Sequence, residues 1–600
     1  MRYIQNNIPN PNKVYSFALN NFVGGLNNKE QQPNENQCTS VMNMAFMPDG
    51  VMEKRRGVTQ FDSKVLDKPV VWVDEFMPSN PDAPDDVNQL VRASKKEIWF
   101  DANLVRTFPE EKRVHGINHK GKYFFVDGSG LFAYGRFTDK AGTYVRLVGT
   151  ATTNFILMEI VSPPEGFTPL DTSHKKGVTV LDYTNRKVWY EPCQNEIKDT
   201  FKEGNVVPKK PRFIVAREGR IYVAGDDKDN DTVAISDTGN PYYFPAVLPL
   251  QLPPNSDRIA GLAVYNDAVV VGRRLDIHAI IGDTNRTDAG LPVFKLKKLN
   301  AHFGFASQDS VVQAHNYLFF LGSDSNFYVL RNLEYSTDVL STQIISQTVN
   351  IHSDPINVQK DDIWNASATF YNDCYYVSVG DKILVYHYLH RAWTVYDQIG
   401  ATCFYVLFNT LLFGAKNGKI LMPSNDYLDE GKPYKALWRT KWLDMGDPNA
   451  LKFFRDFFIV SRTTKEYTST VNMKFEVDYQ DVDKEVDIMT SYSIYGKSVW
   501  GDYFINRDVN TSRPFQIFRR GRTIRITFWN AETVSREVAT VADLDTITPL
   551  VMNMVVKVLE DGKYYILEQN GGWRVWEEGE YDQGMCLLQL SGEYEFKWKR

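Results

Sequence analysis

A degenerate repeat of short strands constrains this chain more than any other feature. Its unit is an apolar strand, a turn, an aromatic strand that ends in glycine, a polar turn and a further strand. Clear copies lie at residues 219–236, 316–331, 373–397 and 409–422. Successive units start near Phe213, Ile259, Val311, Ala366 and Ala401, so the starts are 46, 52, 55 and 35 residues apart. Short antiparallel strands that recur every ~40–50 residues are typical of β-propeller blades.

The repeat therefore predicts an all-β fold, namely a degenerate β-propeller of six to eight blades followed by a C-terminal antiparallel β-sandwich. Two earlier units, at 71–108 and 114–148, extend the ring toward the start of the chain. The 13 % aromatic content suits half-buried pleated surfaces. A series of β-hairpins in a sandwich would give a similar strand count, so this alternative stays open. Residues 191–204 are the clearest candidate for a short helix.

Changes of pattern divide the chain into four segments. Residues 1–60 are polar and Asn-rich and predict an N-terminal arm. Residues 61–430 hold the repeat, with a proline-broken, irregular insertion near 150–210. Residues 431–540 carry longer strands that alternate apolar and polar side chains, as a two-faced sandwich requires. Residues 541–600 predict a small C-terminal β-hairpin module.

Charge and cysteine content narrow the class of protein. Lys+Arg 68 against Asp+Glu 74 gives a formal net charge of −6, which argues against a basic groove for nucleic acid phosphates. No apolar run is long enough for a signal peptide or a membrane-spanning segment, so we expect neither. No two cysteines are close in sequence, which predicts reduced thiols, a chain made in the cytosol and no zinc site. The five cysteines are Cys38, Cys193, Cys374, Cys403 and Cys586.

Two histidine pairs are the candidates for metal ligands. His387 and His390 are three residues apart in a strand-turn segment, where an extended backbone would put them on opposite faces. His115 and His119 flank Gly-Ile-Asn, which is interpreted as a turn. Hydrogen-bonded or solvated strand histidines are the favoured interpretation of both pairs.

The acidic segment 226–231 is a candidate for a calcium loop. Asp227, Asp229 and Asp231 alternate as at the start of an EF-hand loop. Thr232 replaces the turn glycine, however, and Thr238 stands where a bidentate glutamate is needed. We therefore predict a solvated loop between two strands.

A run of arginines is the candidate for contact with an acidic partner or with a DNA backbone. The alternative is a set of arginines on the polar face of a sandwich strand, which the alternation around position 525 favours. The run consists of Arg519, Arg520, Arg522 and Arg525.

Catalytic motifs are missing from the sequence. No G-x-S-x-G elbow or P-loop lysine motif is present. The segment 236–239 is one residue short of the Asp-box that recurs in sialidases. A carboxylate pair contributed by distant strands stays open, because sequence cannot pair such residues. We predict that the chain is not an enzyme and has no catalytic, cofactor-binding or metal-binding residues and no cofactor.

Three phrases, taken in order, resemble one group of proteins. The first comprises G-G-L-N at 24–27, M-N-M at 42–44, D-G-V at 49–51 and K-R-R-G at 54–57. The second is AISDTGNPYYFP, with Ser236, Gly239, Asn240, Pro241 and Phe244 in an S-x-x-G-x-P-x-x-F arrangement. The third is the strand–turn–strand segment 258–282. Together with the repeat, they resemble the β-propeller tail proteins of tailed bacteriophages: the nozzle or tail tubular B proteins and related packaged-DNA stabilisation proteins.

This resemblance implies a structural virion protein in the tail, made in the cytoplasm of the host bacterium. It implies a homo-oligomeric ring, a hexamer, below the portal and adaptor proteins and above tail-tip or fibre proteins. The ring would line the DNA exit channel, retain packaged DNA and gate its ejection, with viral double-stranded DNA passing non-specifically through the lumen. A slightly acidic chain repeated around such a ring would not hold phosphates tightly. The loops that form the gate are not identified by the sequence.

Other functions stay open. A long-tailed phage could use a similar protein at its head–tail joint or tail tip. A glycan-binding propeller of the tail would need exposed aromatic rings, whereas buried structural anchors are the favoured interpretation of the candidates. A propeller glycoside hydrolase is a further alternative. The aromatic candidates are Trp364, Trp393, Trp438 and Trp442.

Overall fold

The protein is all-β, as the repeat predicts. Among the described residues of the computed structural model, the helical elements are two 3₁₀ turns, η1 (Gln308–Ser310) and η2 (Asp362–Asn365). None of the described helical elements has the length and apolar character that a membrane crossing needs. The structure describes residues 13–19, 21–29, 33–47, 51–78, 87–136, 155–160, 178–181, 187–190, 206–227, 229–254, 257–266, 268–282, 293–299, 302–331, 342–462, 469–490, 509–511, 515–530, 556–558, 564–567, 573–575 and 586–597.

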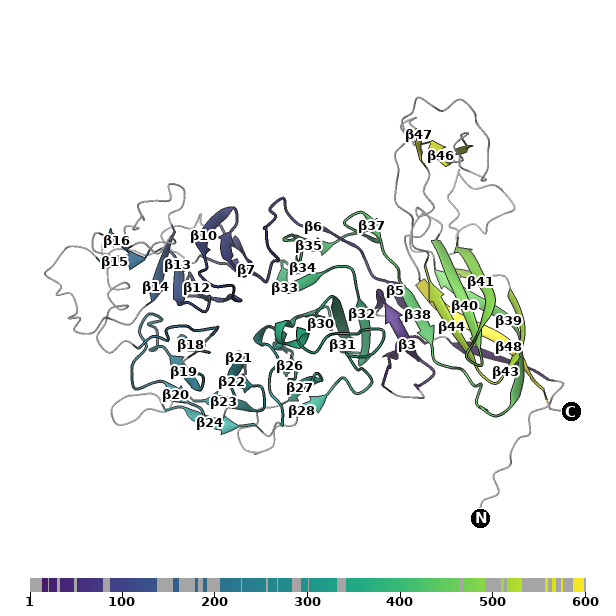
Figure 1. Ribbon diagram of the computed structural model, residues 1–600, viewed down its shortest axis with the longest axis horizontal. Helices are drawn as coiled ribbons and strands as arrows, with labels where there is room; N and C mark the ends of the chain where they lie inside the picture. The colour runs from purple at the N-terminus through teal and green to yellow at the C-terminus, as the bar shows by residue number, and fades with distance from the viewer. Residues whose placement is uncertain are drawn as a thin grey trace, which may run out of the picture.

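Seven small sheets, called sheets 1–7 in chain order, surround a common centre (Figure 1). Sheet 1 contains β7 (Trp72–Phe76), β8 (Gln89–Ala93), β9 (Glu97–Phe100) and β10 (Asn103–Thr107). Sheet 2 contains β11 (His115–His119), β12 (Lys122–Val126), β13 (Leu131–Gly135) and β14 (Ile156–Ile160). Sheet 3 contains β17 (Phe213–Arg217), β18 (Arg220–Ala224), β19 (Thr232–Ile235) and β20 (Leu250–Gln251).

Sheet 4 contains β21 (Ile259–Tyr265), β22 (Ala268–Arg273), β23 (Ile277–Ile281) and β24 (Lys295–Lys298). Sheet 5 contains β25 (Val312–Ala314), β26 (Tyr317–Leu321), β27 (Phe327–Arg331) and β28 (Thr342–Ile344). Sheet 6 contains β29 (Ser367–Tyr371), β30 (Cys374–Val379), β31 (Lys382–His387) and β32 (Ala392–Tyr396). Sheet 7 contains β33 (Ala401–Leu407), β34 (Thr410–Ala415) and β35 (Ile420–Pro423), together with β6 (Val58–Gln60), β36 (Leu428–Asp429) and β37 (Lys432–Pro433). The strands of sheets 1–7 pair antiparallel except for β6 with β36 in sheet 7, which pair parallel.

The first strands of the seven sheets contact one another in a closed circle. From β7 the contacts pass through β11, β17, β21, β25 and β29 to β33, and β33 contacts β7 again. The two ends of this circle are also joined by backbone pairing, because β6 pairs antiparallel with β35, with Gln60 opposite Leu421. A strand from the N-terminal segment thus completes the last sheet.

Local turn chemistry explains why the repeat was visible in the sequence. Two-residue turns with positive φ at both positions join the first and second strands at Glu218–Gly219, Asn372–Asp373 and Phe408–Asn409. The predicted unit starts at Phe213, Ile259 and Ala401 coincide with the first residues of β17, β21 and β33, and the other two lie one residue before β25 and β29.

Sheets 1–7 are together called the ring, and two larger sheets lie beside it (Figure 1). Phe457 of one sheet and Phe475 of the other contact each other, with ring centroids 5.3 Å apart, so side chains of the two sheets share a core. The seven-stranded sheet contains β1 (Val14–Leu19), β4 (Met44–Phe46), β5 (Met52–Lys54), β39 (Leu451–Arg462), β42 (Val509–Thr511), β43 (Phe515–Gly521) and β48 (Cys586–Lys597). The six-stranded sheet contains β2 (Gly25–Leu26), β3 (Gln37–Met42), β38 (Leu437–Thr440), β40 (Ser469–Val477), β41 (Gln480–Thr490) and β44 (Ile524–Trp529).

Both ends of the chain contribute strands to these larger sheets. Within the predicted 1–60 arm, β1 and β5 pair with β48, and β3 pairs with β38. Within the predicted 541–600 module, β48 pairs with β39 of the preceding segment, whereas β45 (Val556–Val558), β46 (Tyr564–Leu567) and β47 (Trp573–Val575) form a small sheet of their own. In the predicted insertion, β15 (Val178–Leu181) pairs with β16 (Lys187–Tyr190). The predicted helix at 191–204 lies outside the described residues.

Candidate functional site

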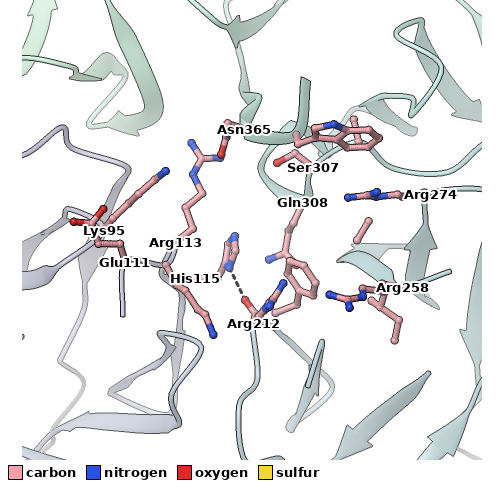
Figure 2. Close-up of a pocket in the computed structure, with 16 residues that line it drawn as sticks. Lys95, Glu111, Arg113, His115, Arg212, Arg258, Arg274, Ser307, Gln308 and Asn365 are labelled. Carbon is pink, nitrogen blue, oxygen red and sulfur yellow. Dashed lines mark hydrogen bonds between the residues drawn. The ribbon is translucent and has the colours of Figure 1, made fainter. Parts of the chain in front are cut away.

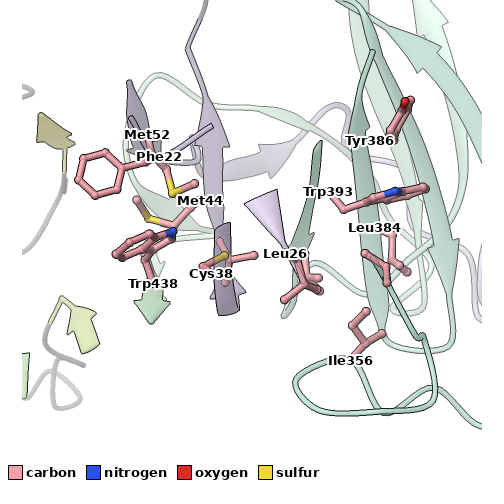
Figure 3. Packing of buried hydrophobic residues seen from close by; sticks show 14 of the residues in the cluster. Phe22, Leu26, Cys38, Met44, Met52, Ile356, Leu384, Tyr386, Trp393 and Trp438 are labelled. Atoms are coloured by element: carbon pink, nitrogen blue, oxygen red, sulfur yellow. The ribbon is translucent and has the colours of Figure 1, made fainter. Parts of the chain in front are cut away.

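The described N-terminal residues 21–29, 33–47 and 51–60 form the seam between the ring and the two larger sheets. Leu26 and Cys38 are fully buried in one apolar cluster that includes Trp393 of sheet 6 and Trp438 of β38 (Figure 3). The ring of Phe22 packs edge-on against Trp438, with centroids 4.9 Å apart. A continuous apolar core therefore links the two parts of the molecule, and the N-terminal strands lie inside it.

A buried polar network fixes the seam. The Arg55 guanidinium donates to both carboxylate oxygens of Asp429, at 2.8 and 2.5 Å, and also to Asn43 Oδ1 at 3.0 Å. It lies over the Tyr434 ring, 3.9 Å from the centroid, and donates to the Asp397 carbonyl at 3.0 Å. Burial by itself lowers the pKa of Arg55, but the hydrogen bond and charge of Asp429 outweigh it and raise the pKa above the usual value. The group therefore stays charged, and its partner is a structural carboxylate.

The glycines of the first phrase lie where the seam is tightest. A Cβ on Gly57 would stand 2.0 Å from the carbonyl oxygen of Leu428, and one on Gly24 would stand 2.5 Å from that of Asn36. Gly25 has a φ of +66° and lies against the backbone of Trp393. Real side chains do not tolerate such approaches, so glycine at 25 and 57 follows from close packing of the segment against the ring, and glycine at 24 from close packing within the segment itself.

A cavity of about 380 Å³, called the mouth, opens among the segments that lead into the first strands of the sheets (Figure 2). Six cationic side chains line it beside one carboxylate, Glu111. The cations come from sheets 1–4 and the segments before them, so they are distant in sequence. They are Lys95, Lys112, Arg113, Arg212, Arg258 and Arg274.

Half of these cations have carboxylate partners. Arg113 pairs with Asp309 at 2.7 Å, and His115 Nε2 lies 3.0 Å from the same carboxylate. Arg212 and Lys112 both pair with Asp227, the latter at 3.6 Å. Burial alone would raise the pKa of Asp309, but the charges of His115 and Arg113 hold it below its ordinary value.

The other three cations differ. Lys95, Arg258 and Arg274 are exposed and have no carboxylate partner among the described residues. Arg274 lies over the ring of Trp364, 4.2 Å from its centroid, and so packs against an aromatic face rather than an acid. The mouth thus carries positive charge that the described part of the chain does not neutralise.

A second cavity of about 410 Å³ lies beside the first strands, and both cavities are lined by Gln308. Its wall includes Asp74, whose Oδ2 accepts a hydrogen bond of 2.8 Å from the Tyr123 hydroxyl. That hydroxyl accepts a hydrogen bond from Trp72 Nε1 at 2.9 Å. Burial raises the pKa of Asp74 to about 6, against the opposing effect of the Tyr123 hydrogen bond.

The histidine predictions need correction. His387 ends β31 and His390 follows in the turn, so their rings stack, 4.4 Å apart, instead of lying on opposite faces. Burial lowers the pKa of His387, followed by the charge of His390. His115 and His119 do not flank a turn, because the intervening Gly-Ile-Asn is part of strand β11. Among the described residues, no group of three or more His, Cys, Asp or Glu side chains could hold a metal ion.

The acidic segment lies between β18 and β19, and its carboxylates do not converge. Asp226 accepts backbone N–H bonds from Lys209 and Lys210, at 2.8 and 3.0 Å. Asp227 pairs with Arg212, and Asp231 lies 3.3 Å from Arg273. The carboxylate oxygens of these aspartates thus bind protein groups and hold the neighbouring loops in place.

The arginine run lies where β43 leads into β44. Arg525 makes a bidentate ion pair with Glu476 on the neighbouring β40, with N–O distances of 2.6 and 2.7 Å. Arg519 and Arg520 are exposed on β43. The placement of Arg525 agrees with the favoured interpretation, arginines on the polar face of a strand.

The tryptophans divide into two groups. Trp393 and Trp438 are each 1 % exposed and belong to the apolar core, as the favoured interpretation requires. Trp364 and Trp442 are half-buried, the first under Arg274 and the second under Arg525. Trp442 also contacts the exposed ring of Tyr479, 4.4 Å away.

The second phrase is a structural loop of sheet 3. Ser236 is buried and its hydroxyl accepts the Ile221 N–H at 2.8 Å. Gly239 has a φ of +76° and donates its N–H to the Gly219 carbonyl at 3.0 Å. Phe244 is buried in the core between sheets 2 and 3.

The mouth is the functional candidate that sequence reasoning missed, although a signal existed. Arg212 and Arg258 each stand immediately before the first strand of a sheet, and Arg113 stands two residues before another. A cation at the same point of successive repeat units predicts convergence, because the first strands of all units lie around one centre.

The fold defines an all-β protein of many small antiparallel sheets. No family model matches the chain, and no curated protein matches it. Similar solved structures include the computationally designed Ika8 protein, with 11 % identity and a TM-score of 0.30 over 61 % of this chain and 99 % of that one. They also include the extracellular domain of BT4673 from B. thetaiotaomicron, with 11 % identity, a TM-score of 0.26 and 87 % and 53 % coverage. PorZ, a surface component of the type-IX secretion system of Porphyromonas gingivalis, has 11 % identity, a TM-score of 0.26 and 77 % and 58 % coverage.

Proposed function

We propose that this chain is a structural protein of a tailed bacteriophage, a nozzle or tail-tube component whose copies form a ring below the portal and adaptor. In this proposal sheets 1–7 are the blades of a seven-bladed β-propeller, and the two larger sheets form a β-sandwich. The closed circle of first-strand contacts and the pairing of β6 with β35 support the propeller. The shared core around Phe457 and Phe475 supports the sandwich.

The observation that carries the proposal is the placement of the first phrase. Gly24, Gly25, Arg55 and Gly57 are among the residues through which the chain resembles the tail proteins, and all four lie in the seam. There Gly25, Gly57 and Arg55 hold the N-terminal segment against sheets 6 and 7 by close backbone approach and a buried ion pair. Strands of the same segment pair with β38 and β48 of the larger sheets. The position of these residues in the seam supports a protein that holds two units in one fixed arrangement, as a structural component of a ring would.

The proposed mechanism is mechanical rather than chemical. Copies of the chain, six in the proposed ring, line the DNA exit channel, retain the packaged DNA and open to release it. The net charge of −6 per chain gives the lumen little attraction for phosphate backbones, so DNA slides through. The chain joins the virion tail after synthesis in the host cytoplasm and contacts portal or adaptor proteins on one side and tail-tip or fibre proteins on the other.

Electron microscopy tests this proposal. The chain is mixed with the portal–adaptor particle of its virus, and the intact virion is imaged in parallel. We expect a closed ring of propellers around the tail axis with DNA behind it. Density only at peripheral positions, or no density for the chain in the virion, would overturn the proposal. An isolated chain that is monomeric is no objection, because a template can be required for assembly.

A groove favours a second candidate, a glycan-binding protein of the tail. A cavity of about 310 Å³ between sheets 5 and 6 is lined by Tyr317, Tyr386 and Tyr388 together with Arg331 and Arg391. Aromatic faces beside hydrogen-bond donors suit sugar rings. Glycan binding by the isolated chain that is lost in Tyr388→Ala would favour this candidate over the ring component, and a chain that binds no glycan would remove it.

A further inference from the structure

We propose that the mouth binds a phosphate group, either inorganic phosphate or the phosphate of a small organic molecule. The proposal does not depend on a role in the tail. It rests on the six cations that line one cavity and on the three of them that have no carboxylate partner among the described residues.

Charge is the first argument. Lys95, Arg258 and Arg274 line the same cavity of about 380 Å³ and have no carboxylate partner in the described part of the chain. Like charges that face one cavity repel each other, and a bound anion removes this cost. Three unpaired cations favour a doubly charged anion such as phosphate over a single carboxylate.

Donor geometry is the second argument. Figure 2 shows the guanidinium groups of Arg258 and Arg274 directed toward the interior of the mouth, on the side of Gln308. Because Arg274 stacks on Trp364, its face is held while its N–H edge stays available to an acceptor. Gln308 Oε1 accepts the Leu262 N–H at 2.9 Å, which fixes the carboxamide. Guanidinium groups held in one orientation can donate two parallel N–H hydrogen bonds to phosphate oxygens.

The surroundings supply the third argument. The paired cations Arg113 and Arg212 are held by Asp309 and Asp227, so these ion pairs fix the position of that side of the mouth and add little net charge. Phe213 and Ile259 add an apolar wall. A cavity of this size lies in the range of small-molecule sites, so it has room for a phosphate with an attached organic group.

Titration calorimetry on the full chain at low ionic strength tests the proposal, with inorganic phosphate and adenosine monophosphate as probes. We expect a dissociation constant of about 1 mM or tighter for at least one probe. Tighter binding of adenosine monophosphate identifies a phosphorylated organic compound as the source, and equal binding identifies free phosphate. Absence of binding for both probes at about 10 mM would overturn the proposal.

Variants locate the site. The double variant Arg258→Gln/Arg274→Gln should weaken binding about 100-fold, on the basis of about tenfold for each charged hydrogen-bond donor. Lys95→Gln should weaken it by about tenfold or less. Lys68→Gln is the matched control, because Lys68 is also exposed but does not line the mouth. Each variant is compared with the parent in thermal unfolding without anion, and the exposed Lys95 provides a test should the double variant misfold. Unchanged binding in all mouth variants, or equal weakening in Lys68→Gln, would overturn the proposal.

Discussion

Removal of the Asp429 carboxylate should destabilise the ring more than removal of any surface acid. In Asp429→Ala the Arg55 guanidinium, whose side chain is 3 % exposed, loses its charged partner and cannot reach solvent. Breaking a buried ion pair in this way costs about 3–5 kcal/mol. Arg55 keeps neutral acceptors in Asn43 and the Asp397 carbonyl, so we expect the lower limit, about 3 kcal/mol.

The size of the cooperative unit converts this cost into a temperature shift. Because the seam joins the ring to the larger sheets, we take the whole chain of 600 residues as that unit. At about 2.1 cal/mol/K per residue, the unfolding entropy is roughly 1.3 kcal/mol/K, so about 3 kcal/mol lowers Tm by about 2 °C. Differential scanning calorimetry of the full chain measures this shift.

An exposed ion pair supplies the control. Asp381 pairs with Lys416 in the same ring but is 82 % exposed, and loss of such a pair typically costs less than about 1 kcal/mol. Asp381→Ala should therefore lower Tm by about 1 °C or less. If Asp429→Ala lowers Tm no more than Asp381→Ala does, Arg55 does not depend on its buried partner and the account of the seam is wrong.

Three further predictions concern buried groups. Because the pKa of Asp74 is raised to about 6 in the folded state, its stabilising contribution is complete below about pH 4 and lost as the pH rises through about 6. Asp74→Asn should therefore raise the free energy of unfolding above that of the parent by on the order of 2 kcal/mol at pH 7 and by little at pH 4. A difference in Tm between variant and parent that does not change with pH would contradict this. Gly57→Ala places a Cβ 2.0 Å from a backbone oxygen and should lower the free energy of unfolding, measured in urea, by about 3 kcal/mol. Gly431→Ala meets open space but has a φ of +78°, so it should lower this free energy by about 1 kcal/mol. Equal costs would refute the steric argument. Burial raises the pKa of Cys374 and of Cys403 to about 12. Mass spectrometry of peptides from alkylated native protein should therefore show neither thiol labelled at pH 8. Rapid labelling of either thiol in the native protein would show that it is not buried.

The ring was predictable from sequence to the extent that it depends on local chemistry. The two-residue turns at Asn372–Asp373 and Phe408–Asn409 and the aromatic strands beside them are contiguous, so the repeat and its start positions could be read directly. The pairing of β6 with β35 could not, because Gln60 and Leu421 are far apart in sequence and neither strand carries a mark for its partner. The same applies to Arg55 and Asp429, whose contact depends on that pairing.

The histidines show a second limit. Strand periodicity places His387 and His390 on opposite faces only if both lie in the strand, and β31 ends at the first of them. For His115 and His119 the difference is the reverse, because Gly-Ile-Asn predicts a turn but lies within strand β11. Element boundaries therefore decide the chemistry of neighbouring side chains, and single-sequence patterns place boundaries poorly.

The seam explains why the two parts of the molecule should unfold together. Strand β6 closes sheet 7, and the strands that precede it pair with β38 and β48 of the larger sheets. Leu26 and Cys38 lie in the core that both parts share. If the N-terminal strands detached, the ring would lose its closing strand and the larger sheets would lose two edge partners, each with exposed backbone groups. Because one segment satisfies both units, separation of either one carries the cost of opening the other, so the ring and the larger sheets behave as one cooperative structure.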